Sequence, residues 1–269
     1  NQAYYISQWY PKPAVYDATG WNPMPYLDQG EFYSEFGSFD VSITLPKNYV
    51  LSATGDRYDN EDEEKFLLQK ILSTEKKIKM LDSAKFQGDM SFPKSDTVLK
   101  TVRFKQENVH DFAWFADKRS TVLRGEMVLP HSKNSVNTWA FFTDNNLDLW
   151  KDAIEYVSDA TYYYSLWNGD YAYNNVTAVD GGTPGGGMEY PNITLIGDVS
   201  TAFELDIVIT HEIGHNWFYG MLGSNERKNM WMDEGINSFN ELRYVQHKYP
   251  NATLATVLGY DSTFKLLHI

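Results

Sequence analysis

Apolar and polar residues alternate with a period of two in several stretches of the first half of the chain, a pattern typical of half-buried β-strands. The alternation is clearest at residues 39–45, where Pro46 and the residues after it end the run. Other strand-like stretches lie at residues 3–7, 49–53, 98–104 and 112–115. Turn-forming Asn, Asp, Gly and Pro residues punctuate this region, so the pattern predicts a β-rich N-terminal domain.

Residues 61–83 interrupt that pattern with a different period. Apolar residues such as Phe66 and Ile71 recur there at helical spacing among many Glu and Lys residues. The segment is therefore predicted to be an amphipathic helix inserted into the β-rich region, with its charged side chains facing solvent.

Helical and strand-like patterns mix after residue 118. Strands are expected at 122–129, 138–142 and 192–197, and helices at 147–166, 201–219 and 232–248. A glycine-rich loop is expected at 181–187, and Thr201 with Glu204 has the spacing of a helix capping box. The sequence predicts an α+β fold with a domain boundary near residue 118, which divides the chain into 1–118 and 119–269.

Composition narrows the possible functions. The chain has 269 residues with 23 Lys and Arg against 36 Asp and Glu, a net charge of −13, so nucleic acid is not expected as a partner. It contains no cysteine, which excludes disulfides, thiolate metal sites and a cysteine nucleophile. No apolar run reaches the roughly 18 residues that a transmembrane helix needs. The ends look cut, so we expect this chain to be part of a longer polypeptide.

The strongest chemical signal is the run His-Glu-Ile-Gly-His at 211–215. Residues four apart share one helix face, so His211 and His215 can bind one metal ion while Glu212 projects beside them toward a water molecule. Two imidazoles and a carboxylate, with a fourth position for water, suit Zn²⁺. Apolar neighbours predict that the helix is buried, where these groups need partners. The motif predicts a metal-assisted hydrolase.

Two later carboxylates are candidates for the same site. Eighteen residues separate His215 from Glu234, which lies near the start of the next predicted helix and is the expected third zinc ligand. Glu241 lies two helical turns further along the same face. It is expected either to orient a ligating histidine or to face solvent.

The motif with this spacing resembles the gluzincins of the aminopeptidase N and leukotriene hydrolase type. Residues 186–190, Gly-Gly-Met-Glu-Tyr, are similar to the G-x-M-E-N signature of that family. The resemblance implies that Glu189 binds the free α-amino group of a peptide, while Gly187 and Met188 line the substrate. Tyr190 departs from the pattern, since many relatives have Asn there, and this leaves one backbone contact open. Gln2 is similar to the family's amine-anchoring Gln, or else is an ordinary strand residue.

The resemblance also implies an architecture and an activity. The expected fold is the rear part of a saddle-shaped β-domain followed by the first part of a thermolysin-like zinc domain. The expected activity is removal of N-terminal residues from peptides, with one Zn²⁺ per chain. The family's transition-state tyrosine should fall beyond Ile269, so this chain is expected to bind zinc but to turn over slowly or not at all.

Two alternatives remain open at this stage. One is another zinc hydrolase, either an endopeptidase or an epoxide hydrolase, and the other is a non-catalytic scaffold with the same fold. The remaining histidines, at 110, 131, 247 and 268, lack metal spacing and are expected at the surface or in loops. The compartment is unknown from the sequence, and resemblance alone favours the cell envelope or periplasm.

Overall fold

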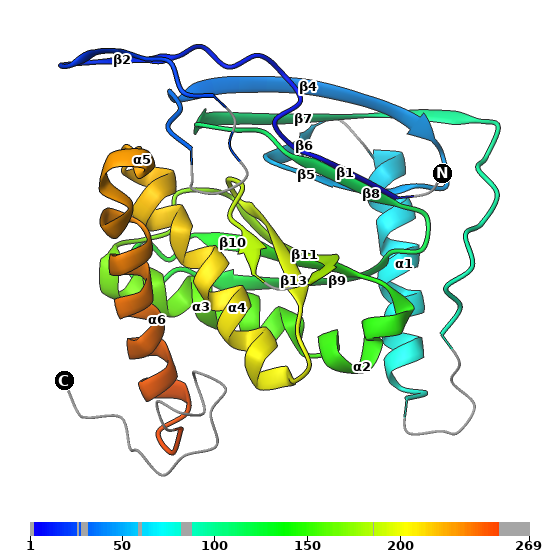
Figure 1. Ribbon diagram of the computed structural model, residues 1–269. Helices are drawn as coiled ribbons and strands as arrows, with labels where there is room; N and C mark the ends of the chain where they lie inside the picture. Colours follow the sequence, from blue (N-terminus) through cyan, green and yellow to red (C-terminus); the bar gives the residue numbers. More distant parts are fainter. Residues whose placement is uncertain are drawn as a thin grey trace.

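The computed structural model describes residues 3–25, 27, 32–58, 61–81, 88–184 and 186–252 (Figure 1). Gln2 and His268 lie outside the described residues. Three layers follow one another from top to bottom in Figure 1: small antiparallel sheets, a larger mixed sheet, and a layer of helices. The α+β fold class predicted from the sequence is confirmed.

The first 117 residues supply the small sheets. One has the order β1 (Ala3–Ile6), β8 (Trp114–Asp117), β5 (Val50–Ala53), and another the order β4 (Gly37–Pro46), β7 (Leu99–Val109), β6 (Asp56–Tyr58). Strands β2 (Val15–Asp17) and β3 (Gly20–Asn22) form a separate hairpin. Apolar side chains of the two three-stranded sheets, among them Leu51 and Phe104, pack together with Phe112 from the connection between β7 and β8.

The larger sheet has the order β12 (Gly187–Met188), β13 (Ile193–Asp198), β11 (Asn175–Pro184), β10 (Ser135–Phe142), β9 (Thr121–Val128). Its three central strands are parallel, and the two edge strands β9 and β12 run antiparallel to their neighbours. Strand β10 is apolar on both faces, because Ala140 and Phe142 pack toward the helices while Trp139 and Phe141 pack toward the small sheets.

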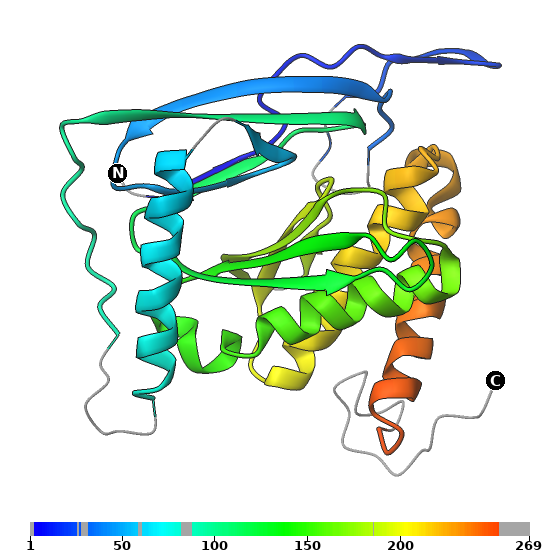
Figure 2. The ribbon, with the colours of Figure 1, turned by 180° about the vertical axis from the view of Figure 1, so that it is seen from behind.

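Two long helices cover one face of this sheet, as the two views in Figures 1 and 2 show. They are α3 (Ala153–Asn168) and α4 (Ala202–His215), preceded by the short α2 (Leu147–Trp150). Helix α6 (Glu234–Lys248) packs beside α4, and α5 (Glu226–Asn229) lies in the connection between them. Among the described residues, no helix is both long enough and apolar enough to cross a bilayer.

Helix α1 (Glu61–Ile78) confirms the predicted inserted helix, although it ends five residues earlier than expected. It is not a purely solvated element. Leu67 is fully buried, the Thr74 hydroxyl accepts a hydrogen bond from the Val122 amide at 3.1 Å, and Lys77 pairs with Asp144 at 2.6 Å. The helix therefore joins the first part of the chain to the larger sheet, and the boundary near residue 118 stays a prediction.

Three other element predictions were partly wrong. The expected helix 147–166 is split into α2 and α3, and much of the expected loop 181–187 belongs to β11 and β12. Helix α4 stops at His215 and continues as a π-helical turn through Met221. The side chain of Asn216 donates to the Ile213 carbonyl and accepts from the Asn192 amide, and this competition with regular backbone pairing explains the change of winding.

Candidate metal centre

The helix that carries the histidine pair begins at a capping box, as predicted. Thr201 Oγ1 accepts from the Glu204 amide at 3.1 Å, and the Glu204 carboxylate accepts from the Thr201 amide at 3.0 Å. The helix then buries Leu205, Ile209 and Ile213 against the sheet. This packing fixes α4 along its whole length, so the imidazoles at its C-terminal end have a defined position.

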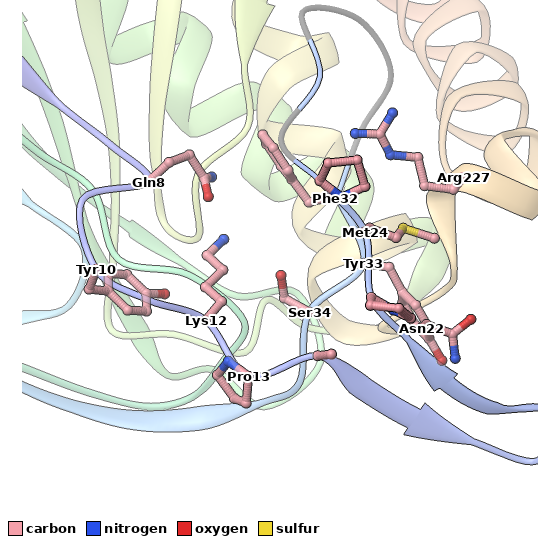
Figure 3. A pocket seen from close by; sticks show the side chains of 13 residues that line it. Gln8, Tyr10, Lys12, Pro13, Asn22, Met24, Phe32, Tyr33, Ser34 and Arg227 are labelled. Carbon is pink, nitrogen blue, oxygen red and sulfur yellow. The ribbon is translucent and has the colours of Figure 1, made fainter.

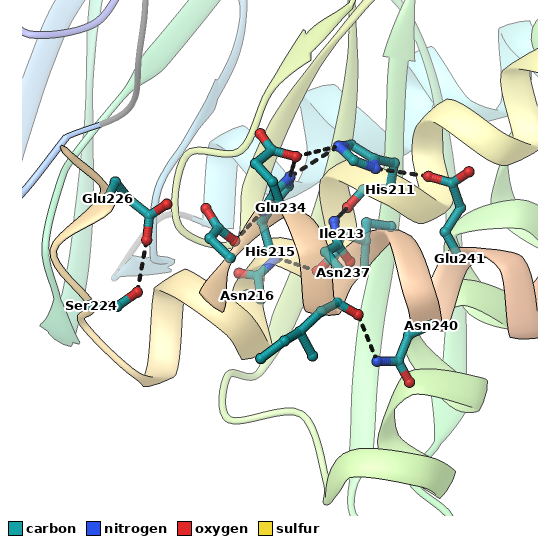
Figure 4. Close-up of polar contacts among 12 residues, drawn as sticks. His211, Ile213, His215, Asn216, Ser224, Glu226, Glu234, Asn237, Asn240 and Glu241 are labelled. Carbon is teal, nitrogen blue, oxygen red and sulfur yellow. Dashed lines mark hydrogen bonds and ion pairs between the residues drawn. The ribbon is translucent and has the colours of Figure 1, made fainter. Parts of the chain in front are cut away.

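His211, His215 and Glu234 converge on one point (Figure 4). The two Nε2 atoms are 3.1 Å apart, and Glu234 Oε2 lies 3.4 Å from Nε2 of His211 and 3.8 Å from Nε2 of His215. Ligand atoms at 2.0–2.1 Å from a tetrahedral zinc are about 3.3 Å from one another. The three distances fit that geometry. The Glu234 side chain is 44% exposed, which leaves the centre open on one side.

The outer nitrogens of both rings face carboxylates. His211 Nδ1 lies 2.8 Å from Glu241 Oε2, and His215 Nδ1 makes a short hydrogen bond with Asp233 Oδ1. Each Nδ1 therefore carries a proton and donates it to its carboxylate, so each Nε2 can present a lone pair to a cation or share a proton with the other ring. Two lone pairs at this distance repel each other unless a cation or a proton lies between them. The donor set fits a divalent metal ion.

Proton binding follows the same electrostatics. Burial by itself would lower the pKa of His211. The hydrogen bonds with Glu234 and Glu241 outweigh burial and raise the pKa from 6.5 to about 10. The hydrogen bond with His211 lowers the pKa of Glu234 below its ordinary value. The carboxylates that hold a proton on this imidazole also attract a divalent cation, so metal and proton compete for the same position.

Glu189 and Glu212 meet beside this centre. Both carboxylates are buried, and donor atoms of Glu189, Glu212 and His215 all lie within 4.8 Å of one another. Strand β12 passes against Glu212 so closely that a Cβ on Gly187 would be 2.3 Å from Glu212 Oε1. Only glycine fits at that point. The close packing of β12 against Glu212 brings Glu189 to the same side as the metal centre. Met188 is half-buried, with its carbonyl accepting from Thr194 Oγ1 at 3.2 Å.

These two carboxylates and His215 do not form an independent second metal site. His215 Nδ1 is engaged with Asp233, so its Nε2 can serve one ion only. With that nitrogen directed to His211 and Glu234, Glu189 and Glu212 are two buried acids beside the centre. Such a pair suits a cationic group and a mobile proton.

The comparisons with known proteins find similarity to aminopeptidases and to zinc metallopeptidases. No protein-family model matches the chain. A stretch of 53 residues is 31% identical to aminopeptidase Q from Mus musculus. It makes up 20% of this chain and 10% of that protein. A stretch of 81 residues is 32% identical to leucine aminopeptidase 2-1 from Meyerozyma guilliermondii. It makes up 29% of this chain and 13% of that protein. The crystal structure of an M1 zinc metallopeptidase from Deinococcus radiodurans matches 85% of this chain with a TM-score of 0.54 and 14% identity.

The fold of this chain is similar to part of the fold of that M1 zinc metallopeptidase. The resemblance to zinc aminopeptidases inferred from the motifs is thereby confirmed. The chain covers 43% of the Deinococcus radiodurans structure, and the matches span still smaller shares of the two curated relatives.

Three residues around this candidate metal centre were missed by sequence reasoning. Asp233 pairs with His215, while Asn237 donates to the His211 carbonyl at 2.7 Å and accepts from the Tyr164 hydroxyl at 2.8 Å. Gly214 allows α4 to approach both neighbours. One signal was available, because ligating histidines usually donate to a carboxylate and Asp233 immediately precedes the expected third ligand.

The prediction for His110 was wrong. It was expected at the surface or in a loop, but it is 5% exposed, and its ring centroid lies 4.1 Å from that of Tyr219 in the turn after α4. The preceding strand β7 carries His110 under this turn, which a search for metal spacing does not detect. Burial lowers the pKa of His110 from 6.5 to about 4.

We expect this histidine to make the folded chain sensitive to mild acid. The unfolded chain takes up the proton first, so stability falls as the pH drops from about 6.5 to about 4, by up to about 3 kcal/mol. His110→Phe should flatten this part of the pH profile in urea unfolding, whereas His247→Gln, on the exposed side of α6, should not. A His110→Phe profile as steep as that of the unaltered chain would contradict the expectation.

Proposed function

We propose that this chain is the zinc-binding part of an aminopeptidase, which removes the N-terminal residue of a peptide. The observation that carries the proposal is the meeting of Glu189 and Glu212 beside the convergent His211, His215 and Glu234. His211, His215 and Glu234 would bind a metal ion, and Glu212 would transfer a proton. Glu189 adds a buried carboxyl group that could pair with a peptide's free amino group.

His211, His215 and Glu234 would hold one Zn²⁺ per chain. Zinc, when bound, supplies a Lewis acid that polarises the scissile carbonyl and makes water acidic enough to attack near neutral pH. Glu241 and Asp233 keep the two imidazoles turned so that Nε2 faces inward. For Glu241 this is one of the two roles predicted from the sequence.

Glu212 would move the proton. Its carboxylate accepts a proton from the attacking water as the new C–O bond forms, and it delivers that proton to the leaving amine as the C–N bond breaks. Burial against β12 keeps the carboxylate out of bulk water and holds its position, because the Gly187 backbone lies directly against it.

Glu189 would fix the register of the substrate. A carboxylate that pairs with the α-ammonium holds the first peptide bond over the metal. Gly187 and Met188 lie on the edge strand β12, which is hydrogen-bonded to β13 on one side within the described sheet. An extended peptide could pair with its other edge. The anchoring role of Gln2 stays a prediction.

A binding experiment tests the amine anchor without requiring turnover. L-Alanine hydroxamate and its N-acetyl derivative both present a zinc-binding group, and only the first has a free ammonium. We expect isothermal titration of the zinc-loaded chain to show the free amine binding about 10–100-fold more tightly, since a hydrogen bond to a charged group contributes about 1.5–3 kcal/mol.

Glu189→Gln should abolish that difference. Glu126→Gln provides the matched control, because Glu126 is exposed on β9 at the opposite edge of the same sheet. Equal binding of the two hydroxamates would contradict the aminopeptidase proposal and favour an endopeptidase. A chain that takes up no zinc would favour the scaffold alternative.

Turnover is a separate prediction. Since the family resemblance puts the oxyanion-donating tyrosine beyond Ile269, we expect hydrolysis of an aminoacyl anilide to be about 10²–10³-fold slower than by an intact aminopeptidase. Release of the aniline chromophore by the zinc-loaded chain measures this rate. Rates typical of an intact enzyme would contradict the expectation.

A further inference from the structure

Cavities lie away from the candidate metal centre in the described part of the chain. One, of about 570 Å³, lies between the N-terminal segment and α5, and Figure 3 shows its two cations, Lys12 and Arg227, on opposite sides of Phe32. Lys12 is already paired with Asp111 at 2.6 Å. A second cavity, of about 320 Å³, has several polar groups that remain available, so it is the better candidate for a ligand site.

The second cavity lies where the first part of the chain meets the larger sheet. Residues of β5, β6 and the turn between them form one wall, strands β9, β10 and β11 form another, and Glu64 of α1 lies at the side. Strand β9 is the edge of the sheet opposite β12, and none of the candidate metal or substrate residues lines this cavity. Junctions between packed parts of a protein are common places for ligand sites.

Arg57 is mostly enclosed here, with a side chain that is 13% exposed, yet it uses only part of its donor capacity. Its Nε donates to Glu64 Oε1 at 2.8 Å, and its Cζ lies 4.3 Å from the centre of the Trp139 ring. Contact with an aromatic face consumes no N–H group. Neither Nη atom of Arg57 has a hydrogen-bonding partner among the described residues, so its terminal N–H groups are available to a ligand.

Other polar groups of the lining also have bonding capacity left. Trp139 is 4% exposed, but its indole N–H has no partner within the described chain, although a buried indole usually has one. The side-chain nitrogens of Asn174 and Asn175 donate to Asp56 at 2.7 and 2.6 Å, whereas their amide oxygens have no described partner. The cavity therefore presents both donors and acceptors.

The charges of the described lining cancel. Its cations are Arg57 and Arg124, and its acids are Asp56 and Glu64. Glu64 bridges the two arginines, because its Oε2 also lies 3.8 Å from Arg124 Nη1. Both oxygens of Asp56 already accept from asparagine amides. A neutral ligand therefore needs no counter-charge in this cavity.

We propose that this cavity binds a neutral sugar. Neighbouring hydroxyl groups of a pyranose ring can accept from Arg57 Nη and the Trp139 indole while they donate to the amide oxygens of Asn174 or Asn175. A carboxylate only accepts hydrogen bonds, so it would leave those amide oxygens unpaired. The volume is near the lower end of the range for small-molecule sites, which suits a single sugar ring better than a longer chain.

Indole N–H signals allow the test to be local. In ¹H–¹⁵N NMR of the zinc-loaded chain, Trp139 reports on this cavity, and Trp217, which donates to the Gly169 carbonyl at 2.7 Å, reports on the turn after α4. The probes are the methyl α-D-pyranosides of glucose, galactose and mannose. We expect at least one of them to shift the Trp139 signal with a dissociation constant of about 1–10 mM, and Trp217 to stay unchanged.

Two further probes define the chemical class. Glucuronate keeps the sugar ring but adds a negative charge, and N-acetylglycinamide is neutral and polar but has no hydroxyl group. We expect glucuronate to bind no more tightly than the best methyl pyranoside, because the lining has no net positive charge. The amide should bind at least tenfold more weakly, because it offers fewer groups that both donate and accept.

Arg57→Lys should weaken binding of the best methyl pyranoside at least tenfold, because lysine keeps a positive charge beside Glu64 but has no planar fork. Trp139→Phe removes the indole donor, assigns the Trp139 signal and serves if the first variant is unstable. Calorimetric titration of Trp139→Phe should show a loss of about threefold to tenfold. Arg103→Lys is the matched control, because Arg103 pairs with Asp40 on the neighbouring strands and does not line the cavity.

The proposal is overturned if none of the three pyranosides shifts Trp139, or if glucuronate binds more tightly than the best of them. It is also overturned if N-acetylglycinamide binds as tightly as the sugar, or if Arg103→Lys loses as much affinity as Arg57→Lys. A sugar that shifts Trp217 alone contradicts it as well, since the ligand then binds elsewhere. Failure of the aminopeptidase proposal would leave the Trp139 result unaffected.

Discussion

Replacing His215 with alanine is expected to weaken zinc binding by about 10²–10⁴-fold. Structural zinc sites have apparent binding free energies of about 10–16 kcal/mol, and loss of one of three protein ligands should remove roughly 3–5 kcal/mol. His215 is buried and its Nε2 lies 3.1 Å from that of His211, so its loss removes one of the two imidazole nitrogens that converge at the centre. Competition with a chromophoric chelator measures the affinity.

Two further variants separate a ligand from a residue that orients one. Asp233→Asn keeps a hydrogen-bond acceptor near His215 Nδ1 but removes the charge, and should cost about 10–100-fold in zinc affinity. His247→Ala removes an exposed histidine of α6 that contacts Tyr163 and should leave zinc affinity unchanged. If His215→Ala bound zinc as tightly as the unaltered chain, the metal centre assigned to α4 and Glu234 would be wrong.

The second large effect is expected for Gly214→Ala. An added Cβ would lie 2.0 Å from Asn237 Oδ1 and 2.4 Å from Tyr164 Cε1, so α3 and α6 would both have to move away from α4. Such overpacking lowers the free energy of unfolding by about 1–3 kcal/mol, and the strained Tyr164–Asn237–His211 hydrogen bonds add to the loss. Urea unfolding at fixed pH and zinc concentration measures the change.

Gly235→Ala is the matched control for this substitution. Gly235 is exposed near the start of α6, and an added Cβ there would meet only Trp231 Cβ, at an ordinary 3.6 Å. Because alanine favours the helix by up to about 1 kcal/mol over glycine, this variant should be neutral or slightly stabilised. A Gly214→Ala chain as stable as the Gly235→Ala chain would show that the helices tolerate a wider separation.

Local chemistry explains the predictions that hold. The capping interaction of Thr201 with Glu204 depends on residues three apart, and the shared face of His211 and His215 depends on residues four apart. Spacing and family resemblance predicted Glu234 as the third ligand. The structure places its carboxylate near both imidazoles. The hydrogen bond between Glu241 and His211 is also present, while its orienting role stays a prediction.

Errors arose where distant segments meet. The π-helical turn after His215 follows from Asn216 pairing with the Asn192 backbone, a contact across 24 residues. His110 is buried because β7 passes beneath that turn. Neither contact leaves a periodic pattern in the sequence, because each depends on how separate elements pack.

The sequence by itself determined an α+β chain, a capped and buried helix, and two imidazoles on one face of it with a carboxylate between them. These follow from residue spacing, since a helix repeats every 3.6 residues wherever it lies. Only the tertiary structure decided that the edge strand β12 presses Gly187 against Glu212 and that Asp233 and Asn237 close around the histidines. Those contacts join elements through sheet order and helix packing, and local propensity carries no information about either.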